Sequence, residues 1–511
     1  MTSTARLVVL PAEPIATVSP ALHGQFAEHL GELVYPGVWV GPDSPVPNVD
    51  GIRSDVVAAL EPLHIPVLRW PGGCFADDYH WRDGIGPRDS RPARLNTHWG
   101  MAPEPNSFGT HEFIAFARAI GAEPYFAGNV GSGTVSELRD WVEYCNHPAG
   151  STLSDERRAN GAAEPFGVRL WGIGNENWGC GGNLTPEAYA EEYVRYRHYA
   201  FPFGGTEVTG VACGPNSADW SWTRRFLEQL TGSSRCRLGS VQAFAAHYYC
   251  GTAGTATEFN DSQWLELLTR AVAIEGIITG HRSIMDSFDP ERKIQLFLDE
   301  WGAWHPVETG KPARGLYQQN TMRDALVAAL SLDIFHNHAD KLAMANIAQL
   351  INVLQSLLLV EGDRCITTPT YHVFSMYQAH RGGTAVRLVN ASEVISHGEA
   401  AEDECRERYL DRRRAELHLV SGSASTTADR LCATVVNSHP SEPADLDLQI
   451  AGGRSTVAES VTLSHADTHA HNTFEDPDAV VPAAPVSVAV DGGRLRTRLE
   501  PGSVTRFLVP A

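Results

Sequence analysis

The stretch RLWGIGNENWGCGGNLTPEAYAEEYVRYRHYA, residues 169–200, decides the fold. It begins with an apolar run, residues 169–174, that is typical of a buried strand. It ends with a helical pattern opened by Thr185 and Pro186, because proline is tolerated at the first helical position. A glycine-rich loop joins the two parts. A strand, a loop and a helix in this order form the repeating unit of proteins with parallel sheets.

The same unit recurs from about residue 20 to about residue 380, and a further helix is expected over residues 317–337. Eight parallel strands can close into a barrel whose interior is filled by side chains. The sequence therefore predicts an α/β fold, a (β/α)8 TIM barrel, rather than an open doubly wound sheet. The eight expected strands cover residues 22–26, 66–70, 124–129, 169–174, 208–213, 241–248, 294–299 and 341–347.

The last part of the chain has a different pattern. Residues 446–452 alternate between apolar and polar side chains, and the triplet at 491–493, Asp-Gly-Gly, is typical of a hairpin turn. These features predict an antiparallel β-sandwich, jelly-roll-like, over residues 381–511. We expect residues 1–19 to add a strand to this sandwich and residues 20–380 to form the catalytic barrel. Residues 392–414 are dense in charge and are interpreted as a solvated insertion.

Composition excludes several classes of partner. The 511 residues carry a formal net charge of -21, which repels nucleic acid and anionic membrane surfaces. No apolar run approaches the roughly 18 residues of a membrane-spanning helix, and the N-terminus lacks the pattern of a secretory signal, so we expect a cytoplasmic protein. Nine cysteines without a CxxC pair predict reduced thiols rather than disulfides.

Two glutamates follow expected strands, Glu176 after the fourth and Glu300 after the seventh. Barrel enzymes work at this end, where loops distant in sequence meet. Hydrolysis of a glycosidic bond needs one protonated acid and one carboxylate, and two glutamates meet that need. Arg69, at the end of the second strand, could keep a nearby carboxylate ionised. The alternatives for each glutamate are a helix cap or a surface side chain.

Eight segments of the chain, in order, closely resemble glycoside hydrolase family 51, the α-L-arabinofuranosidases. The resemblance spans the whole barrel. The segments are LHGQFAEHLGELVYPGVWVG (22–41), LRWPGGCFADDYHWRDGIGPRDSRP (68–92), SFGTHEFIAF (107–116), LWGIGNENWGCGGNLTPEAYAEEY (170–193), ACGPNSADW (212–220), AHYY (246–249), LDEWGAWH (298–305) and LYQQNTMRDALVAALSLDIF (316–335).

The resemblance implies roles for individual residues. Glu176 would be the general acid/base and Glu300 the nucleophile, with Asp299 as its outward-facing neighbour because side chains alternate along a strand. Asn175 would bind the sugar 2-hydroxyl, and Tyr249 would orient Glu300. Glu28 and Gln349 would hold other hydroxyls of the furanose.

Three further residues complete the predicted site. Trp99 is expected to line the pocket, and His247 to support it from behind. Cys74 follows Pro-Gly-Gly, where many family members have asparagine, so a contact to a sugar hydroxyl is lost or replaced. Asp77 or Asp78 could take over that contact, and a buried inert thiol is the alternative interpretation of Cys74.

The sequence thus predicts a retaining, exo-acting α-L-arabinofuranosidase that cleaves arabinose-containing oligosaccharides through a covalent intermediate. No cofactor and no metal are expected, and the resemblance implies a homo-oligomer, a hexamer. One alternative is a glycosidase of the same fold with another specificity, such as a β-xylosidase, an endoglucanase or another furanosidase. The other is a non-catalytic carbohydrate-binding protein. A retaining enzyme needs carboxyl groups about 5 to 5.5 Å apart, and an inverting one about 6.5 to 9.5 Å.

Overall fold

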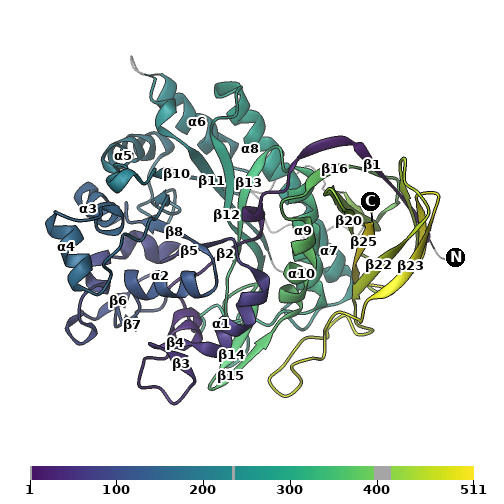
Figure 1. Cartoon of the computed structure of the whole chain (residues 1–511), viewed down its shortest axis with the longest axis horizontal. Helices are drawn as coiled ribbons and strands as arrows, with labels where there is room; N and C mark the ends of the chain where they lie inside the picture. Colours follow the sequence, from purple (N-terminus) through teal and green to yellow (C-terminus); the bar gives the residue numbers. More distant parts are fainter. Residues whose placement is uncertain (1–2, 233–235, 252, 396–415, 511) are drawn as a thin grey trace.

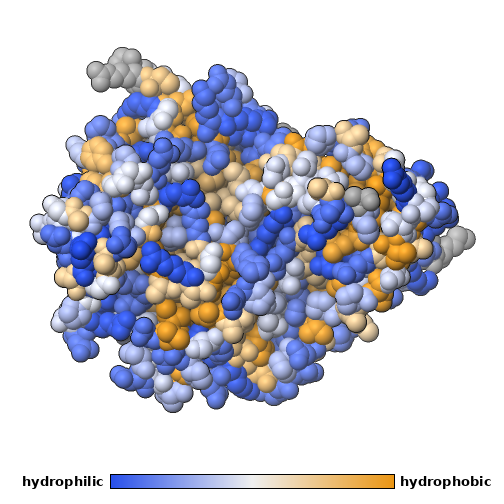
Figure 2. All heavy atoms as spheres, viewed as in Figure 1, coloured by the Kyte–Doolittle hydropathy of each residue, from blue (hydrophilic) through white to orange (hydrophobic). Residues whose placement is uncertain are grey.

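The computed structural model describes residues 3–232, 236–251, 253–395 and 416–510, and it contains two parts (Figure 1). A parallel barrel occupies most of the chain, and a strand-rich domain packs beside it. Of the predicted insertion at 392–414, the residues from 396 onward lie outside the described part of the chain. Hydrophilic residues cover most of the face in Figure 2, and apolar residues form scattered patches on it.

The barrel has eight parallel strands that neighbour one another in sequence order. The last strand pairs with the first through residues 346–348 and 24–26, which closes the sheet. Each of the eight expected strands is present, so the predicted (β/α)8 barrel is confirmed. The strands are β2 (Gly24–Phe26), β5 (Val67–Trp70), β8 (Glu123–Gly128), β9 (Leu170–Ile173), β10 (Thr209–Asn216), β11 (Ala243–Gly251), β12 (Gln295–Trp304) and β13 (Leu342–Ala348).

The helices begin where local capping signals place them. Thr185 accepts a hydrogen bond from the Ala188 backbone and opens α5, as predicted. The helix expected from residue 317 starts later, because Thr321 caps α9 just before Met322 and Tyr317 instead bridges to Val353. The helices are α1 (Ser54–Leu60), α2 (Thr110–Ala119), α3 (Val135–Asn146), α4 (Thr152–Ala159), α5 (Pro186–Tyr199), α6 (Trp220–Thr231), α7 (Asp261–Val272), α8 (Ile274–Phe288), α9 (Met322–Asn337) and α10 (Pro369–Tyr377).

The barrel interior is a packed core. A second, larger apolar cluster fills the space between the strands and the surrounding helices. Because the centre is filled, ligands can reach only the rim of the barrel. The side chains that fill the centre are Val67, Tyr125, Leu170, Val211, Ala243, Ala245, Phe297 and Met344.

The strand-rich domain is one closed sheet of nine strands. Neighbouring strands are antiparallel, except that β1 runs parallel to β21. The predicted turn at 491–493 joins β23 to β24. In sheet order the strands are β1 (Ser3–Thr17), β16 (Thr384–Asn390), β19 (Val420–Thr426), β20 (Arg430–Asn437), β25 (Ser503–Pro510), β22 (Thr456–Leu463), β23 (Val486–Asp491), β24 (Arg494–Leu499) and β21 (Ala444–Ile450).

Helices α9 and α10 lie between the barrel and the strand-rich domain (Figure 1). Asp333 on α9 links them, because its carboxylate accepts from Ser423 and Thr434 of the domain and from Tyr377 of α10.

No helix within the described ranges has the length and apolar character needed to cross a membrane. Four short pairs complete the fold: β3 (Asn48–Val49) with β4 (Ile52–Arg53), β6 (Arg94–Asn96) with β7 (Ala102–Glu104), β14 (Leu358–Glu361) with β15 (Arg364–Thr367), and β17 (Val394–Ile395) with β18 (Leu417–His418).

Candidate active site

A small pocket of about 50 Å³ opens where the barrel strands end at their carboxyl side. Seven residues singled out from the sequence line it: Glu28, Cys74, Trp99, Glu176, Tyr249, Glu300 and Gln349. Apolar side chains that sequence reasoning did not single out complete the wall: Leu30, Trp304, Leu316 and Leu354. The other predicted site residues, Arg69, Asn175 and His247, are buried and contact the two catalytic candidates or each other.

Glu300 is held on both carboxylate oxygens. Arg69 donates to Oε1 at 2.9 Å, and the Tyr249 hydroxyl donates to Oε2 at 2.8 Å. Burial on its own lowers the pKa of Arg69, but the negative charges of Asp299 and Glu300 raise it above the ordinary value, so Arg69 remains a cation. Burial and the charge of Glu300 raise the pKa of Tyr249, which therefore stays protonated and continues to donate. Glu300 thus has a fixed orientation and a buried counter-charge.

A bulge in β12 corrects the prediction for Asp299. Glu300 lies inside the strand rather than after it, and the pairing with β11 shifts from Ala246↔Leu298 to His247↔Glu300. Asp299 is the extra residue of this bulge, and a bulge breaks the alternation of side chains. The Asp299 carboxylate accepts from the Tyr125 hydroxyl of the barrel interior at 2.6 Å and lies 3.5 Å from Arg69. The expectation that Asp299 faces outward is therefore wrong.

Glu176 sits on a tight loop that follows β9. Its φ of 42° falls in the left-handed region, which is costly for a residue with a side chain and persists only where the surroundings hold it. The backbone N–H groups of Gly179 and Gly181 donate to its carbonyl oxygen. Because the backbone is fixed in this way, the Glu176 side chain points into the pocket.

His247 connects the two glutamates. Its Nδ1 lies 2.8 Å from Oε1 of Glu176 and 3.5 Å from Oε2 of Glu300. Burial lowers the pKa of His247, but the charge of Glu300 and the hydrogen bond to Glu176 outweigh burial and raise it. One oxygen of each glutamate and a nitrogen of His247 lie within 4.8 Å of one another. The two carboxyl groups therefore face each other across a gap small enough for one reacting carbon.

Asn175, the residue before Glu176, presents a free donor. Its Oδ1 accepts from Arg69 at 2.6 Å, which fixes the amide orientation. Its Nδ2 is buried and has no acceptor within the described part of the chain. A buried donor without a partner is costly, so a ligand oxygen at this place would be favoured.

Glu28 forms the opposite wall of the pocket. Its carboxylate accepts from the Phe75 backbone, from Nε1 of Trp99 and from Nε2 of Gln349, at 3.0, 2.9 and 3.1 Å. Burial, followed by the charge of Glu300, raises the pKa of Glu28 to about 7, although the three hydrogen bonds oppose this rise. Glu28 is thus poised to exchange a proton near neutral pH.

Asp77 anchors the loop of Glu176. It lies on the short helix η4 (Cys74–Asp78), and its Oδ2 accepts from the Asn175 backbone at 2.7 Å and from Nδ2 of Asn177 at 3.3 Å. Its Oδ1 accepts two further backbone N–H groups, at residues 130 and 131. The sequence suggested that Asp77 or Asp78 could contact a sugar hydroxyl. That expectation is wrong, because neither lines the pocket and Asp78 pairs with the Thr97 hydroxyl instead.

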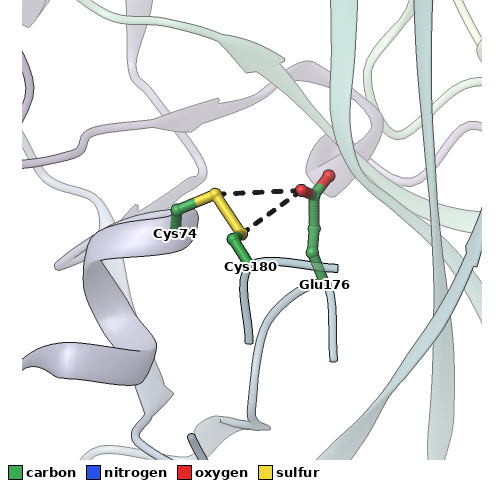
Figure 3. Close-up of side chains that lie close together, drawn as sticks. All are labelled: Cys74, Glu176 and Cys180. Carbon is green, nitrogen blue, oxygen red and sulfur yellow. Dashed lines mark hydrogen bonds between the residues drawn. A yellow bond between two sulfur atoms is a disulfide. The ribbon is translucent and has the colours of Figure 1, made fainter. Parts of the chain in front are cut away.

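A disulfide joins Cys74 to Cys180, with Cα atoms 5.5 Å apart (Figure 3). The prediction that all cysteines are reduced is therefore wrong for this pair, and Cys74 is not an inert thiol. Sequence reasoning missed Cys180, although both cysteines follow the ends of barrel strands and the predicted barrel already places them on the same rim. The other described cysteines are free: Cys145, Cys213, Cys236, Cys250, Cys365 and Cys432.

A closed (β/α)8 barrel with two glutamates facing one rim pocket defines the class of the barrel glycoside hydrolases. Two family models match the chain: Alpha-L-arabinofuranosidase 1 domain over residues 59–203, and Alpha-L-arabinofuranosidase C-terminal domain over residues 299–503. A relative from Bacteroides ovatus, named intracellular exo-alpha-L-arabinofuranosidase, is 40% identical and covers 94% of this chain and 91% of its own.

Solved structures of α-L-arabinofuranosidases are also similar to this chain. The GH51 arabinofuranosidase from Xanthomonas axonopodis pv. citri superposes with a TM-score of 0.92 at 38% identity, over 99% of this chain and 100% of that one. The arabinose complex of the α-L-arabinofuranosidase from Thermotoga maritima gives a TM-score of 0.85 at 29% identity, over the same shares of both chains. The chain belongs to glycoside hydrolase family 51, the α-L-arabinofuranosidase family, which confirms the resemblance found in the sequence.

Proposed function

We propose that this protein is an exo-acting α-L-arabinofuranosidase that releases terminal arabinofuranosyl residues from oligosaccharides with retention of configuration. The observation that supports this most directly is the approach of Glu176 and Glu300, with carboxylate oxygens within 4.8 Å of one another in a single pocket. Retaining enzymes need a short separation, because the nucleophile itself must reach the anomeric carbon. An inverting enzyme would need room for a water molecule between Glu300 and the sugar.

The proposed reaction has two steps. In the first, Glu300 attacks the anomeric carbon while Glu176 donates a proton to the leaving oxygen, and a covalent glycosyl-enzyme forms. In the second, Glu176 takes a proton from water, which displaces Glu300. Arg69 and Tyr249 hold the Glu300 carboxylate throughout, and His247 holds Glu176 in reach of the leaving oxygen.

The pocket residues divide the sugar between them in this proposal. The free Nδ2 of Asn175 donates to the 2-hydroxyl, a contact that tightens as the transition state forms. Glu28 and Gln349 bind the other ring hydroxyls, and Gln349 has a buried, unpaired Oε1 available for this. Trp99 and Cys74 close the sides of the pocket.

A glycosidase of another specificity remains the second candidate. The small pocket favours a single terminal sugar, whereas an endoglucanase needs an open cleft. Comparing 4-nitrophenyl α-L-arabinofuranoside with the matching β-D-xylopyranoside separates an arabinofuranosidase from a β-xylosidase. A non-catalytic binding protein is disfavoured, since it would gain nothing from two buried carboxylates held so close together.

Mutation of Glu300 tests the mechanism. Glu300→Ala is expected to abolish turnover of aryl α-L-arabinofuranosides, and azide is expected to rescue Glu300→Gly with a glycosyl azide of inverted configuration. Glu187→Ala is the matched control, because Glu187 lies in the first turn of α5, outside the pocket lining, and its carboxylate forms an ion pair with exposed Arg225. Ordinary activity in Glu300→Ala, or a rescued product of retained configuration, would refute the assignment.

We also propose a cytoplasmic homo-oligomer, a hexamer, that acts on arabinose-containing oligosaccharides. The name of the Bacteroides relative, which places that protein inside the cell, supports the location. Light scattering after gel filtration tests the hexamer, and a single species with the mass of one chain would contradict it.

A further inference from the structure

Two sulfur atoms in the pocket wall lie beside the proposed acid/base. Oε2 of Glu176 is 4.0 Å from Sγ of Cys74 and 3.6 Å from Sγ of Cys180 (Figure 3). The two cysteines come from different elements, η4 and the loop after β9. All three side chains are partly exposed, so solutes can reach them. Neither sulfur is needed for the proposed glycosidase steps.

We propose that opening this disulfide creates a binding site for one thiophilic divalent cation, such as Zn²⁺, with Cys74, Cys180 and Glu176 as ligands. Thiolates and carboxylates bind Zn²⁺ at about 2.3 and 2.0 to 2.2 Å in a tetrahedral arrangement. In that arrangement sulfur and oxygen ligands lie about 3.6 Å apart, close to the two distances already present. Only the two sulfurs must separate, to about 3.8 Å, and breaking their bond permits this.

The fourth ligand position faces the pocket. Cys74 and Glu176 both line the cavity, so a water molecule can complete the tetrahedron. The other oxygen of Glu176 is held by His247 at 2.8 Å, which fixes the carboxylate as outer partners usually fix metal ligands. After the disulfide opens, two sulfur donors, one carboxylate oxygen and an open position provide the four ligand positions that a cation needs at this rim.

The chemistry balances with a dithiol reductant. One of its thiolates attacks a sulfur of the disulfide, its second thiol resolves the mixed disulfide, and the reductant leaves as a cyclic disulfide while Cys74 and Cys180 gain two electrons and two protons. The cation then displaces both thiol protons and binds the thiolates. In a reducing compartment, the proposed location of this protein, the dithiol form is the one exposed to metal.

Metal binding would stop catalysis. A cation on Oε2 of Glu176 occupies the carboxylate that must deliver a proton to the leaving oxygen. The inhibition, though not the binding itself, rests on the proposed role of Glu176. In the oxidised form, Cys74 and Cys180 have no thiolate that can bind a cation, so the disulfide keeps Glu176 free of metal.

Cadmium titration tests the site without relying on activity. The chain with Cys236→Ser, which removes an exposed free thiol, is reduced with a phosphine, freed of reductant without oxygen, and titrated with Cd²⁺. We expect a cadmium–thiolate charge-transfer band that saturates at one equivalent, and no band in the oxidised protein. One equivalent of Zn²⁺ is expected to abolish activity of the reduced protein only, and a chelator is expected to restore it.

Cys180→Ser in the same background is the matched variant, and it should lose most of the band. An equal band in Cys180→Ser, no band at one equivalent in the reduced protein, or equal zinc inhibition of both redox forms would overturn the proposal. If reduction alone removes activity, the cadmium–thiolate band still shows whether the reduced protein has the proposed metal site. A protein inactive on arabinofuranosides in every state would refute the proposed function and leave the titration unaffected.

Discussion

Replacing Asp77 with asparagine should uncouple the loop of Glu176, the proposed acid/base, from the barrel. The carboxylate accepts four N–H groups, two on each oxygen. An asparagine keeps one oxygen and turns an NH₂ group toward the other pair, so two buried donors lose their acceptor. Each buried donor without an acceptor costs about 1–3 kcal/mol, and we expect Asp77→Asn to destabilise the fold by about 2–4 kcal/mol.

The effect on catalysis should depend on the leaving group. Loss of the hydrogen bonds from Asn175 and Asn177 to residue 77 would allow Glu176 to move. A displacement of about 1 Å can reduce the rate about 100-fold. We expect a loss of this size in kcat/KM for an alkyl α-L-arabinofuranoside, which needs protonation, and a smaller loss for the 4-nitrophenyl arabinofuranoside, whose leaving group needs little. Both rates are measured at a temperature where circular dichroism shows the variant to be folded.

Asp78→Asn is the control for this experiment. Asp78 lies next to Asp77 on the same short helix, but its carboxylate accepts hydrogen bonds from the hydroxyls of Thr97 and Ser132 and from no backbone N–H group among the residues that the structure describes. Asp78→Asn should leave both rates within about a factor of two of those of the parent, since surface substitutions of this kind change the stability little. The reasoning fails if Asp77→Asn behaves like Asp78→Asn, or if it slows the two substrates equally.

Three further predictions each concern one side chain. Tyr249→Phe removes the hydroxyl that donates to Glu300 and should lower kcat/KM about 10- to 100-fold, since a hydrogen bond to a charged group contributes about 1.5–3 kcal/mol; an unchanged value would assign Tyr249 to packing alone. Glu28 has a pKa of about 7 in the folded protein and 4.5 in the unfolded chain, so its contribution to the free energy of unfolding should fall by about 3 kcal/mol as pH rises from about 4.5 to 7. Glu28→Gln should therefore flatten the decline in melting temperature between about pH 5 and 8. Parallel plots of melting temperature against pH for the variant and its parent would contradict this prediction. Asp333→Ala removes the carboxylate that accepts from three hydroxyls at the domain interface and should cost about 3 kcal/mol in chemical denaturation. A change below about 0.5 kcal/mol would show that the interface does not need this link.

The barrel was predictable because its signals are local. Each strand is a short apolar run, and helix starts such as Thr185 carry their own capping residue, so the order of elements follows from windows of a few residues. Closure of the eight strands then placed Glu176 and Glu300 on one rim. The family motifs added which partners surround them. The structure places Glu28, Tyr249 and Gln349 in the pocket wall and Asn175 behind it, hydrogen-bonded to Arg69.

The parts that sequence reasoning missed depend on pairing between distant segments. The bulge at Asp299 exists only in the register of β12 against β11, which no local alternation encodes. The pairing of Cys74 with Cys180 depends on η4 and the loop after β9 meeting at the rim, although the two cysteines are 106 residues apart. The hydrogen bonds of Asp77 also join distant segments, because its carboxylate accepts from backbone N–H groups that follow β8 and β9.

The two glutamates are supported in different ways, and this difference has a consequence for the reaction. Glu300 belongs to a strand whose neighbours fix it through a ladder of backbone hydrogen bonds. This suits its proposed role as a nucleophile that returns to one position in both steps. Glu176 belongs to a loop in a left-handed conformation that η4 fixes from outside, through Asp77 and through the disulfide. Changes in η4 should therefore alter proton transfer, and with it the dependence on the leaving group. Changes around Arg69 and Tyr249 should slow every substrate alike, because the proposed attack by Glu300 would be common to all of them.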